Sequence, residues 1–161
     1  MVGSRNRRRK SAVRPSLARA PILLVAATVR ARDSLQDALR RLGILNPVVA
    51  VAGTRHAELY FEGRGFYRDR RRYPLPAIVL LDLSVSRLRA SALMSFLRHR
   101  PTTRALPIVL LGRSPSGDIV RWAYTSGANS YVVLPQDAEM LAERLRDLIA
   151  YWLEFNRSPQ S

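Results

Sequence analysis

Short apolar runs alternate with amphipathic helical patterns along this chain, and this alternation restricts the fold more than any other feature. The runs lie at residues 22–26, 48–51, 77–83, 107–111 and 130–133. Two of them, AIVLLDL and PIVLL, lack the polar alternation of a half-exposed strand, which predicts central strands covered on both faces. Strand runs separated by helical segments are typical of βαβ units. We therefore expect a doubly wound α/β domain, with a five-stranded parallel sheet and helices on both faces.

Five helices are expected between and after the strands. Their predicted ranges are 33–42, 55–62, 90–98, 117–126 and 137–155. Gly43, Pro101 and Gly127 follow three of these patterns and are residues that commonly end helices. The last helix places a stripe of leucines and Trp152 on one side, for which core packing is the preferred interpretation.

The segment from 63 to 76, GRGFYRDRRRYPLP, is longer than most connections between a helix and a strand. It combines five arginines with Phe66, Tyr67 and Tyr73. Interleaved aromatic rings and guanidinium groups can stack bases and bind phosphates. Equally, the aromatic rings can anchor the loop while the arginines face water, and the sequence leaves both interpretations open.

The charge balance is strongly basic. The formal net charge of the 161-residue chain is +15, and Lys10 is its only lysine, so arginine carries nearly all of the positive charge. Such a chain favours phosphates or acidic protein surfaces as partners, although GC-rich coding bias explains the arginine content equally well. Residues 1 to 20 are predicted to form a flexible basic tail, residues 21 to 155 the folded domain, and residues 156 to 161 a C-terminal tail.

Several classes of site are excluded by composition. The absence of cysteine removes disulfides, thiolate nucleophiles and cysteine-ligated metals. His56 and His99 fall in different predicted helices. No glycine-rich phosphate loop follows the first strand, and no serine nucleophile with a histidine partner is apparent. No apolar run approaches the roughly 20 residues of a membrane span. We expect a cytoplasmic protein that is not an enzyme and does not contact the membrane.

Ligands of open parallel sheets bind beyond the carboxyl ends of the strands. That rule directs attention to Ala26 and Ala27 after the first strand, Asp82 in the third, Gly112 after the fourth, and the Leu134–Pro135 peptide after the fifth.

Four stretches carry a family resemblance: ILLV at 22–25, VLLDLSVSRLRA at 79–90, LPIVLL at 106–111 and GANSYVVLP at 127–135. In their order and intervals they resemble the receiver domains of bacterial two-component response regulators. The similarity spans about residues 21 to 155 and is greatest to single-domain regulators that work with phytochrome-like histidine kinases. It implies a flavodoxin-like, CheY-like sheet in the strand order 2-1-3-4-5.

The family's chemistry requires an aspartate nucleophile, two acids that hold Mg²⁺, a threonine or serine, and a lysine. Carried over by position, the resemblance makes Asp82 the phosphoacceptor. The other positions are degenerate: Ala26 and Ala27 replace the acids, Gly112 replaces the hydroxyl residue, and Leu134 replaces the lysine. A lone carboxylate offers Mg²⁺ too little negative charge, so we expect no metal and no cofactor.

Two further features carry over from the family. Pro135 remains, which makes the peptide before it a candidate for the cis form, and Tyr131 occupies the aromatic switch position. The family's dimer or output face, formed by the fourth helix, fifth strand and fifth helix, contains Trp122, Tyr124, Tyr131 and Arg144.

The preferred interpretation is a pseudo-receiver in a two-component or phosphorelay context. It acts by protein–protein interaction with a sensor histidine kinase or output protein, or as a homodimer through that face. One alternative is an active but atypical phosphoreceiver, in which Arg113, Arg30 or Arg87 supplies the missing positive charge at Asp82. Another is an adaptor that binds nucleic acid through the basic tail and the arginine-rich segment.

Overall fold

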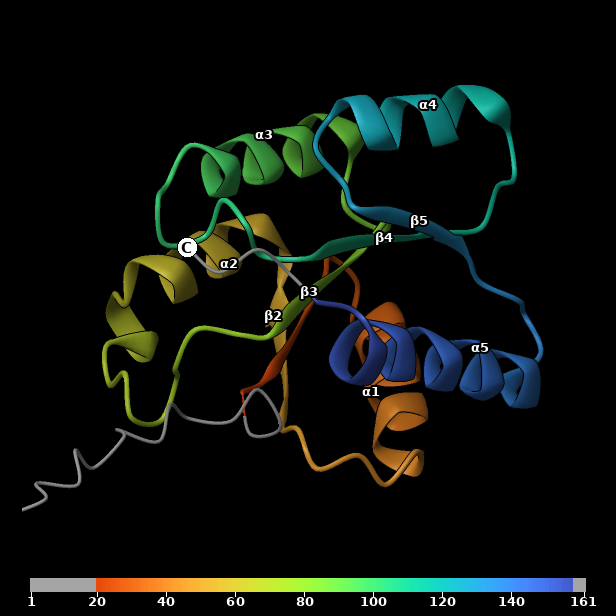
Figure 1. Ribbon diagram of the computed structural model, residues 1–161, viewed down its shortest axis with the longest axis horizontal. Coiled ribbons are helices and arrows are strands. Elements are labelled where there is room, and N and C mark those ends of the chain that lie inside the picture. The colour runs from red at the N-terminus through yellow and green to blue at the C-terminus, as the bar shows by residue number, and fades with distance from the viewer. Residues whose placement is uncertain (1–19, 158–161) are drawn as a thin grey trace, which may run out of the picture.

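The computed structural model describes residues 20–157, so the basic tail and the last four residues lie outside the described part. It contains one parallel sheet in the order β2-β1-β3-β4-β5, which confirms the predicted topology (Figure 1). The strands are β1 Ile22–Ala26, β2 Val48–Ala52, β3 Ile78–Asp82, β4 Ile108–Gly112 and β5 Ser130–Val133. The helices are α1 Val29–Arg41, α2 Gly53–Glu62, α3 Arg87–Arg98, α4 Gly117–Thr125 and α5 Ala138–Ala150.

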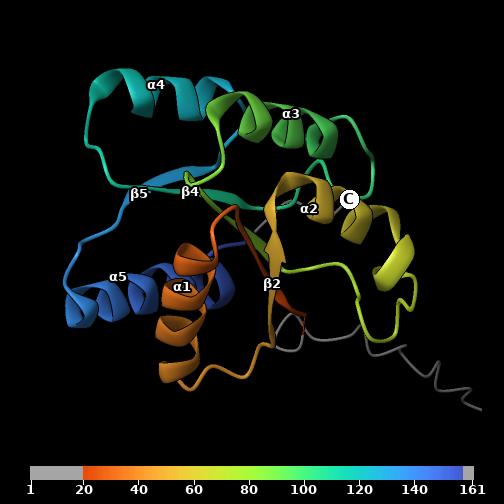
Figure 2. The same cartoon turned by 180° about the vertical axis from the view of Figure 1, so that it is seen from behind.

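The sheet separates two apolar layers. Helices α2, α3 and α4 cover one face, while α1 and α5 cover the other (Figures 1 and 2). Because side chains of a strand alternate between faces, Leu23 and Val25 of β1 pack toward the first layer, and Ile22 and Leu24 pack toward the second. All four side chains are fully buried, as expected for a strand covered on both faces.

Helices α1 and α3 begin earlier than the apolar periodicity predicted, and capping explains the difference. Thr28 accepts a hydrogen bond from the amide of Ala31, so α1 begins at Val29. Ser86 accepts a hydrogen bond from the amide of Arg89, so α3 begins at Arg87. In both helices the apolar side chain of the first turn, Val29 in α1 and Leu88 in α3, is exposed and does not belong to the buried stripe, so hydrophobic spacing alone does not reveal that turn.

The predicted last helix is not continuous to residue 155. Regular α5 ends at Ala150, and Tyr151–Phe155 form a π-helical turn, η3, in which the amide of Asn156 donates to the carbonyl of Tyr151 at 2.7 Å. Trp152 packs against the layer of α1 and α5, which confirms its predicted core role. Between residues 20 and 157, no helix combines the length and apolar character that crossing a bilayer requires.

The arginine-rich segment after α2 is anchored mainly by its own aromatic rings. Tyr60, Tyr67 and Tyr73 pack with ring centroids 5.2–6.1 Å apart. The Arg70 guanidinium donates to the carbonyls of Tyr60, Phe61 and Tyr73 at 2.6, 3.0 and 3.1 Å, and so binds the end of α2 to the loop. These contacts favour the anchoring interpretation over a base-stacking surface.

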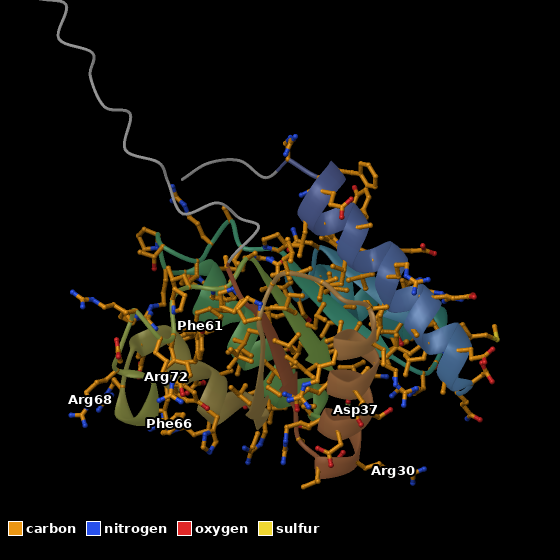
Figure 3. The ribbon with its side chains drawn as sticks, turned by 90° about the horizontal axis from the view of Figure 1, so that it is seen from below. Arg30, Asp37, Phe61, Phe66, Arg68 and Arg72 are labelled. Carbon is orange, nitrogen blue, oxygen red and sulfur yellow. The ribbon has the colours of Figure 1, made fainter. Side chains whose placement is uncertain are left out.

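Other side chains of this segment face outward. Phe66 is 73% exposed, and Figure 3 shows Phe66, Arg68 and Arg72 together on the outer side of the loop. A short 3-10 turn, η2 Gly65–Tyr67, presents the Phe66 ring while burying that of Tyr67.

The Arg98 guanidinium connects several segments at the amino end of the sheet. Arg98, near the end of α3, donates to the carbonyl of Gly127 through Nε and Nη2, and to the carbonyl of Leu106 at 2.8 Å. Its Nη2 also contacts Oδ1 of Asn129 at 2.6 Å, and that oxygen accepts the amide of Ile108 at 2.8 Å. Burial lowers the pKa of Arg98. This network ties α3 to the starts of β4 and β5.

Candidate functional site

Asp82 lies at the carboxyl end of β3, between the neighbouring strands β1 and β4. Its side chain is almost fully buried. Oδ2 accepts the amide of Ser84 at 2.9 Å, and Oδ1 lies 3.7 Å from Nη1 of Arg113. The carboxylate is therefore held by a backbone donor and by an arginine whose side chain is half exposed.

The two alanines after β1 bring no charge to this carboxylate. Ala26 is buried, and the amide of Ala27 donates to Oγ of Ser84 at 2.9 Å, which ties the turn after β1 to the turn after β3. The Arg32 guanidinium donates to the carbonyls of Ala26 and Ala27 at 3.1 and 3.2 Å. Arg32 is not among the site residues predicted from the sequence. The sequence offers one signal for it: Arg32 lies one helical turn after Thr28, the residue that caps α1 just past the end of β1.

These residues do not fit a magnesium site. Mg²⁺ is usually held by one or two carboxylates plus phosphate oxygens and waters. Here alanines stand at the two positions where the resemblance places the acids, and both oxygens of Asp82 already face nitrogen donors. In the part of the chain that the structure describes, no three His, Cys, Asp or Glu side chains gather in a way that could hold a metal. A guanidinium lies on the carbonyls at the end of β1 instead.

Gly112 and Tyr131 form a close contact at the ends of β4 and β5. The Tyr131 hydroxyl donates to the carbonyl of Ser114 at 2.6 Å, and the tyrosine ring lies over Gly112. A Cβ atom on Gly112 would overlap that hydroxyl and lie 2.7 Å from Cζ of the ring. The tyrosine thus fills the space that a threonine or serine side chain would need at position 112.

Leu134, the residue at the expected lysine position, is part of the core. Its side chain is 3% exposed and packs in the apolar layer of α1 and α5, while its amide donates to the carbonyl of Gly112 at 2.8 Å. The candidate cis peptide before Pro135 is not found, because residues 20–157 contain no cis peptide bond. The trans form is intrinsically favoured before proline, and a leucine buried in the core needs no turn that would direct it to the pocket.

The four predicted interface residues differ in accessibility. Trp122 is half-buried against the layer of α2, α3 and α4, and its Nε1 donates to Oγ of Ser91 at 3.2 Å. Tyr124 is 50% exposed, and its hydroxyl accepts the amide of Tyr131 at 3.4 Å. Arg144 is exposed and donates to the carbonyl of Val133 at 2.8 Å. The structure therefore brings Tyr124 and Tyr131 together but turns Trp122 toward α3.

Of the three arginines proposed to replace the missing charge, only Arg113 contacts Asp82 among the described residues. The Arg87 guanidinium instead lies 5.5 Å from the centre of the Trp122 ring. Figure 3 shows Arg30 pointing outward at the start of α1.

A cavity of about 330 Å³ opens beside Asp82 and was not anticipated from the sequence. Its walls come from the turn after β1 and from the starts of α2 and α3. The lining residues are Ala27, Ala52, Gly53, Thr54, Arg55, Ser84, Val85, Ser86 and Arg89. Apart from Ala27, none of these was a predicted site residue.

Several solved structures share this architecture. No family model matches the sequence. A response regulator in red light signalling of R. palustris has 30% sequence identity and a TM-score of 0.78, over 88% of this chain and 99% of that one. A bacteriophytochrome response regulator, RtBRR, also has 30% identity, with a TM-score of 0.67 over 88% of this chain and 84% of that one.

Two further relatives are informative. The phosphorylated cyanobacterial phytochrome response regulator RcpA shares the fold, with 23% identity and a TM-score of 0.75, over 89% of this chain and 100% of that one. A probable methanogenesis regulatory protein of Methanothrix harundinacea, FilR2, is 38% identical over 85 residues. That match covers 53% of this chain and 55% of the relative, so it spans about half the length of the relative.

Proposed function

The chain belongs to the receiver domains of two-component response regulators, and from this membership we propose that it is a pseudo-receiver, which signals by binding proteins without metal-dependent phosphorylation of Asp82. Receiver domains interact with sensor kinases and output proteins. The protein partner of this chain, which we expect in the cytoplasm, belongs to one of these two classes.

The main support is the environment of Asp82. Phosphoryl transfer to an aspartate needs positive charge on the phosphoryl oxygens, and a metal ion and a lysine supply it in this family. Here the metal-binding acids are alanines, and Leu134 is buried in the core. Loss of both groups removes the principal electrostatic stabilisers of the transition state, each worth several kcal/mol or roughly a hundredfold or more in rate.

The position of Tyr131 supports the same proposal. In the family, a hydroxyl residue after the fourth strand moves toward the new phosphate, and the aromatic side chain responds. Gly112 has no hydroxyl to move, and the Tyr131 ring already lies over it, bonded to Ser114. We infer that the face formed by α4, β5 and α5 stays in one arrangement regardless of the state of Asp82.

That face is the proposed docking or dimer surface. Tyr124 is half exposed there, Met140 is 53% exposed, and Arg144 lies beside the end of β5. An aromatic ring, a flexible apolar side chain and a guanidinium are typical interface anchors. Trp122, which packs toward α3, contributes to the shape of the face more than to its exposed area.

Treatment with acetyl phosphate, with and without Mg²⁺, tests the proposal. Mass spectrometry of the intact protein should show little or no phosphorylation under either condition, while an ordinary receiver assayed in parallel becomes labelled with Mg²⁺. Asp82→Asn is the matched control, because it removes the only candidate acceptor and sets the background. Rapid stoichiometric labelling that is absent in Asp82→Asn would overturn the proposal.

A second candidate, the atypical phosphoreceiver, is favoured by one observation. Nη1 of Arg113 lies 3.7 Å from Oδ1 of Asp82, close enough for a guanidinium to approach an attached phosphoryl group. This candidate predicts labelling that needs no Mg²⁺ and is lost in Arg113→Gln. The same assay on that variant therefore separates the two functions.

A further inference from the structure

The cavity beside Asp82 has an unusual charge for its place in the fold. Two arginines, Arg55 and Arg89, are among its lining residues, and no aspartate or glutamate is. Its volume of about 330 Å³ falls at the lower end of the range for small-molecule sites. The walls of the cavity therefore suit an anion rather than a cation.

Thr54 provides an independent sign of a ligand. Thr54 is more than nine-tenths buried and lines the cavity, and its hydroxyl makes no hydrogen bond within the described residues. Among those residues, no side-chain nitrogen or oxygen that is sealed from solvent lacks a partner, so the Thr54 hydroxyl reaches solvent, and the cavity that Thr54 lines is the space next to it. Its hydrogen is therefore free for an acceptor bound in the cavity.

Other donors converge on the same space. Oγ of Ser84 accepts the amide of Ala27, and Oγ of Ser86 accepts the amide of Arg89, so each hydroxyl keeps its own hydrogen for donation. Helix α2 begins at Gly53 without a side-chain cap, which leaves its first amides available to a ligand.

Nearby carboxylates compete only to a limited extent with an anion for the donors around the cavity. Glu58 pairs with Arg55 at 3.3 Å, but that arginine is two-thirds exposed and can turn toward a ligand. The Asp82 oxygens face Ser84 and Arg113. The Arg32 guanidinium, bound to the carbonyls at the end of β1, adds further positive charge next to the cavity.

We propose that this cavity binds a phosphate-type dianion, either free phosphate or the phosphate group of a small phosphomonoester. Arg55 and Arg89 supply the charge, and Thr54, Ser84 and the first amides of α2 supply hydrogen bonds. Such a ligand would bridge the starts of α2 and α3. The site requires no transfer of a phosphoryl group, so it stands whether or not Asp82 is phosphorylated.

Titration of the full chain with inorganic phosphate, followed by ¹H–¹⁵N NMR at constant ionic strength, tests the proposal. A second titration uses phenyl phosphate, and a third uses chloride. We expect saturable shifts concentrated at residues 52–55 and 84–89 with phosphate or phenyl phosphate but not with chloride. The tighter of the two phosphate ligands identifies whether the site takes the free ion or an ester.

Single variants separate a built site from general attraction to a basic protein. Arg89→Ala and Arg55→Ala should each weaken binding about tenfold or more, because each removes charge-assisted hydrogen bonds. Thr54→Val, which keeps the shape of the side chain, should weaken it severalfold. Arg146→Ala, on exposed α5, is the matched control for net charge and should have little effect.

Two outcomes would overturn the proposal. One is the absence of saturable binding at millimolar phosphate; the other is equal weakening by Arg146→Ala and by the cavity variants. Repeating the titration with Asp82→Asn keeps the result independent of the proposed function. Binding should persist in that variant, whereas its loss would place the anion at Asp82 and contradict the assignment to the cavity.

Discussion

The two ends of the β-sheet contain similar polar side chains but leave them in different states. At the amino end, the Arg98 guanidinium reaches Gly127, Leu106 and Asn129, and the Asn129 oxygen also accepts the amide of Ile108. At the carboxyl end, Arg89 is exposed, and its guanidinium has no hydrogen bond or ion pair among the described residues. Donors whose hydrogen bonds are all made within the protein connect its elements, whereas donors without such partners can bind a ligand. This difference predicts that substituting Arg98 will affect stability, whereas substituting Arg89 will affect binding.

The largest expected effect is at the amino end. Arg98→Ala should lower the free energy of unfolding by about 2–4 kcal/mol, since it leaves several partly buried carbonyls without a donor and removes a link between α3, β4 and β5. Urea denaturation measures the change. Arg89→Ala at the other end is the control and should stay within about 0.5 kcal/mol of the parent. Equal losses from the two substitutions would abolish the comparison.

Alkaline pH should affect the amino end next. Burial raises the pKa of Tyr60 to about 12, although the nearby Arg70 guanidinium opposes this shift, and the tyrosine hydroxyl donates to the carbonyl of Pro74 at 2.6 Å. The unfolded chain releases this proton near pH 10, before the folded chain does. Stability should therefore be fully retained below pH 10 and fall by about 2–3 kcal/mol as the pH rises to 12.

Tyr60→Phe isolates this contribution. Its unfolding free energy at pH 8 should be lower than that of the parent by about 1 kcal/mol, for the lost hydrogen bond. Between pH 10 and 12 its decline should be shallower than that of the parent. Parallel curves for the two proteins in urea titrations across this range would rule out the titration of Tyr60 as the cause.

The contact between Gly112 and Tyr131 gives an intermediate effect at the carboxyl end. Gly112→Ala should cost about 1–3 kcal/mol, because the added methyl group forces the tyrosine ring to move. In a Tyr131→Ala background the same substitution should cost much less. A double-mutant cycle by urea denaturation measures this coupling. Additive losses would mean that the ring moves aside at no cost.

The smallest effect is expected at Asp82. Asp82→Asn should lower the free energy of unfolding by less than about 1 kcal/mol, because it removes the attraction between the carboxylate and the half-exposed Arg113. Where several acids crowd together, neutralising one relieves repulsion and raises stability instead. The sign of the change in thermal or urea unfolding therefore reports whether negative charge accumulates here. A clear stabilisation by Asp82→Asn would contradict the description of this pocket.

The strands could be predicted from the sequence because each of them is a short run of apolar residues. The ranges predicted for β1 and β5 match the observed strands, and the strand order followed from the family resemblance. The first residues of the helices were harder to predict. The capping hydroxyls of Thr28 and Ser86 mark them, and the apolar residues of the first turns, Val29 and Leu88, are exposed and do not continue the buried stripe.

For the site, the sequence located the strand-end positions but not their contacts. The Arg32 bonds to the end of β1, the Tyr131 ring over Gly112 and the cavity at Thr54 all depend on side-chain rotamers and on contacts between distant segments. Periodicity and spacing carry no information on either. Arg113 was named as a candidate only because it follows Gly112 in the chain, and it alone of the three proposed arginines reaches the carboxylate.

The ring that covers Gly112 also bears on how such a domain can change over generations. A mutation that restored threonine at position 112 would meet the Tyr131 hydroxyl before it gained any catalytic benefit. Acids at positions 26 and 27 would likewise add negative charge near Asp82 and compete with the carbonyls there for the Arg32 guanidinium. For the proposed pseudo-receiver, each single substitution toward phosphoryl chemistry would thus disturb contacts that the present side chains make, and several would have to change together.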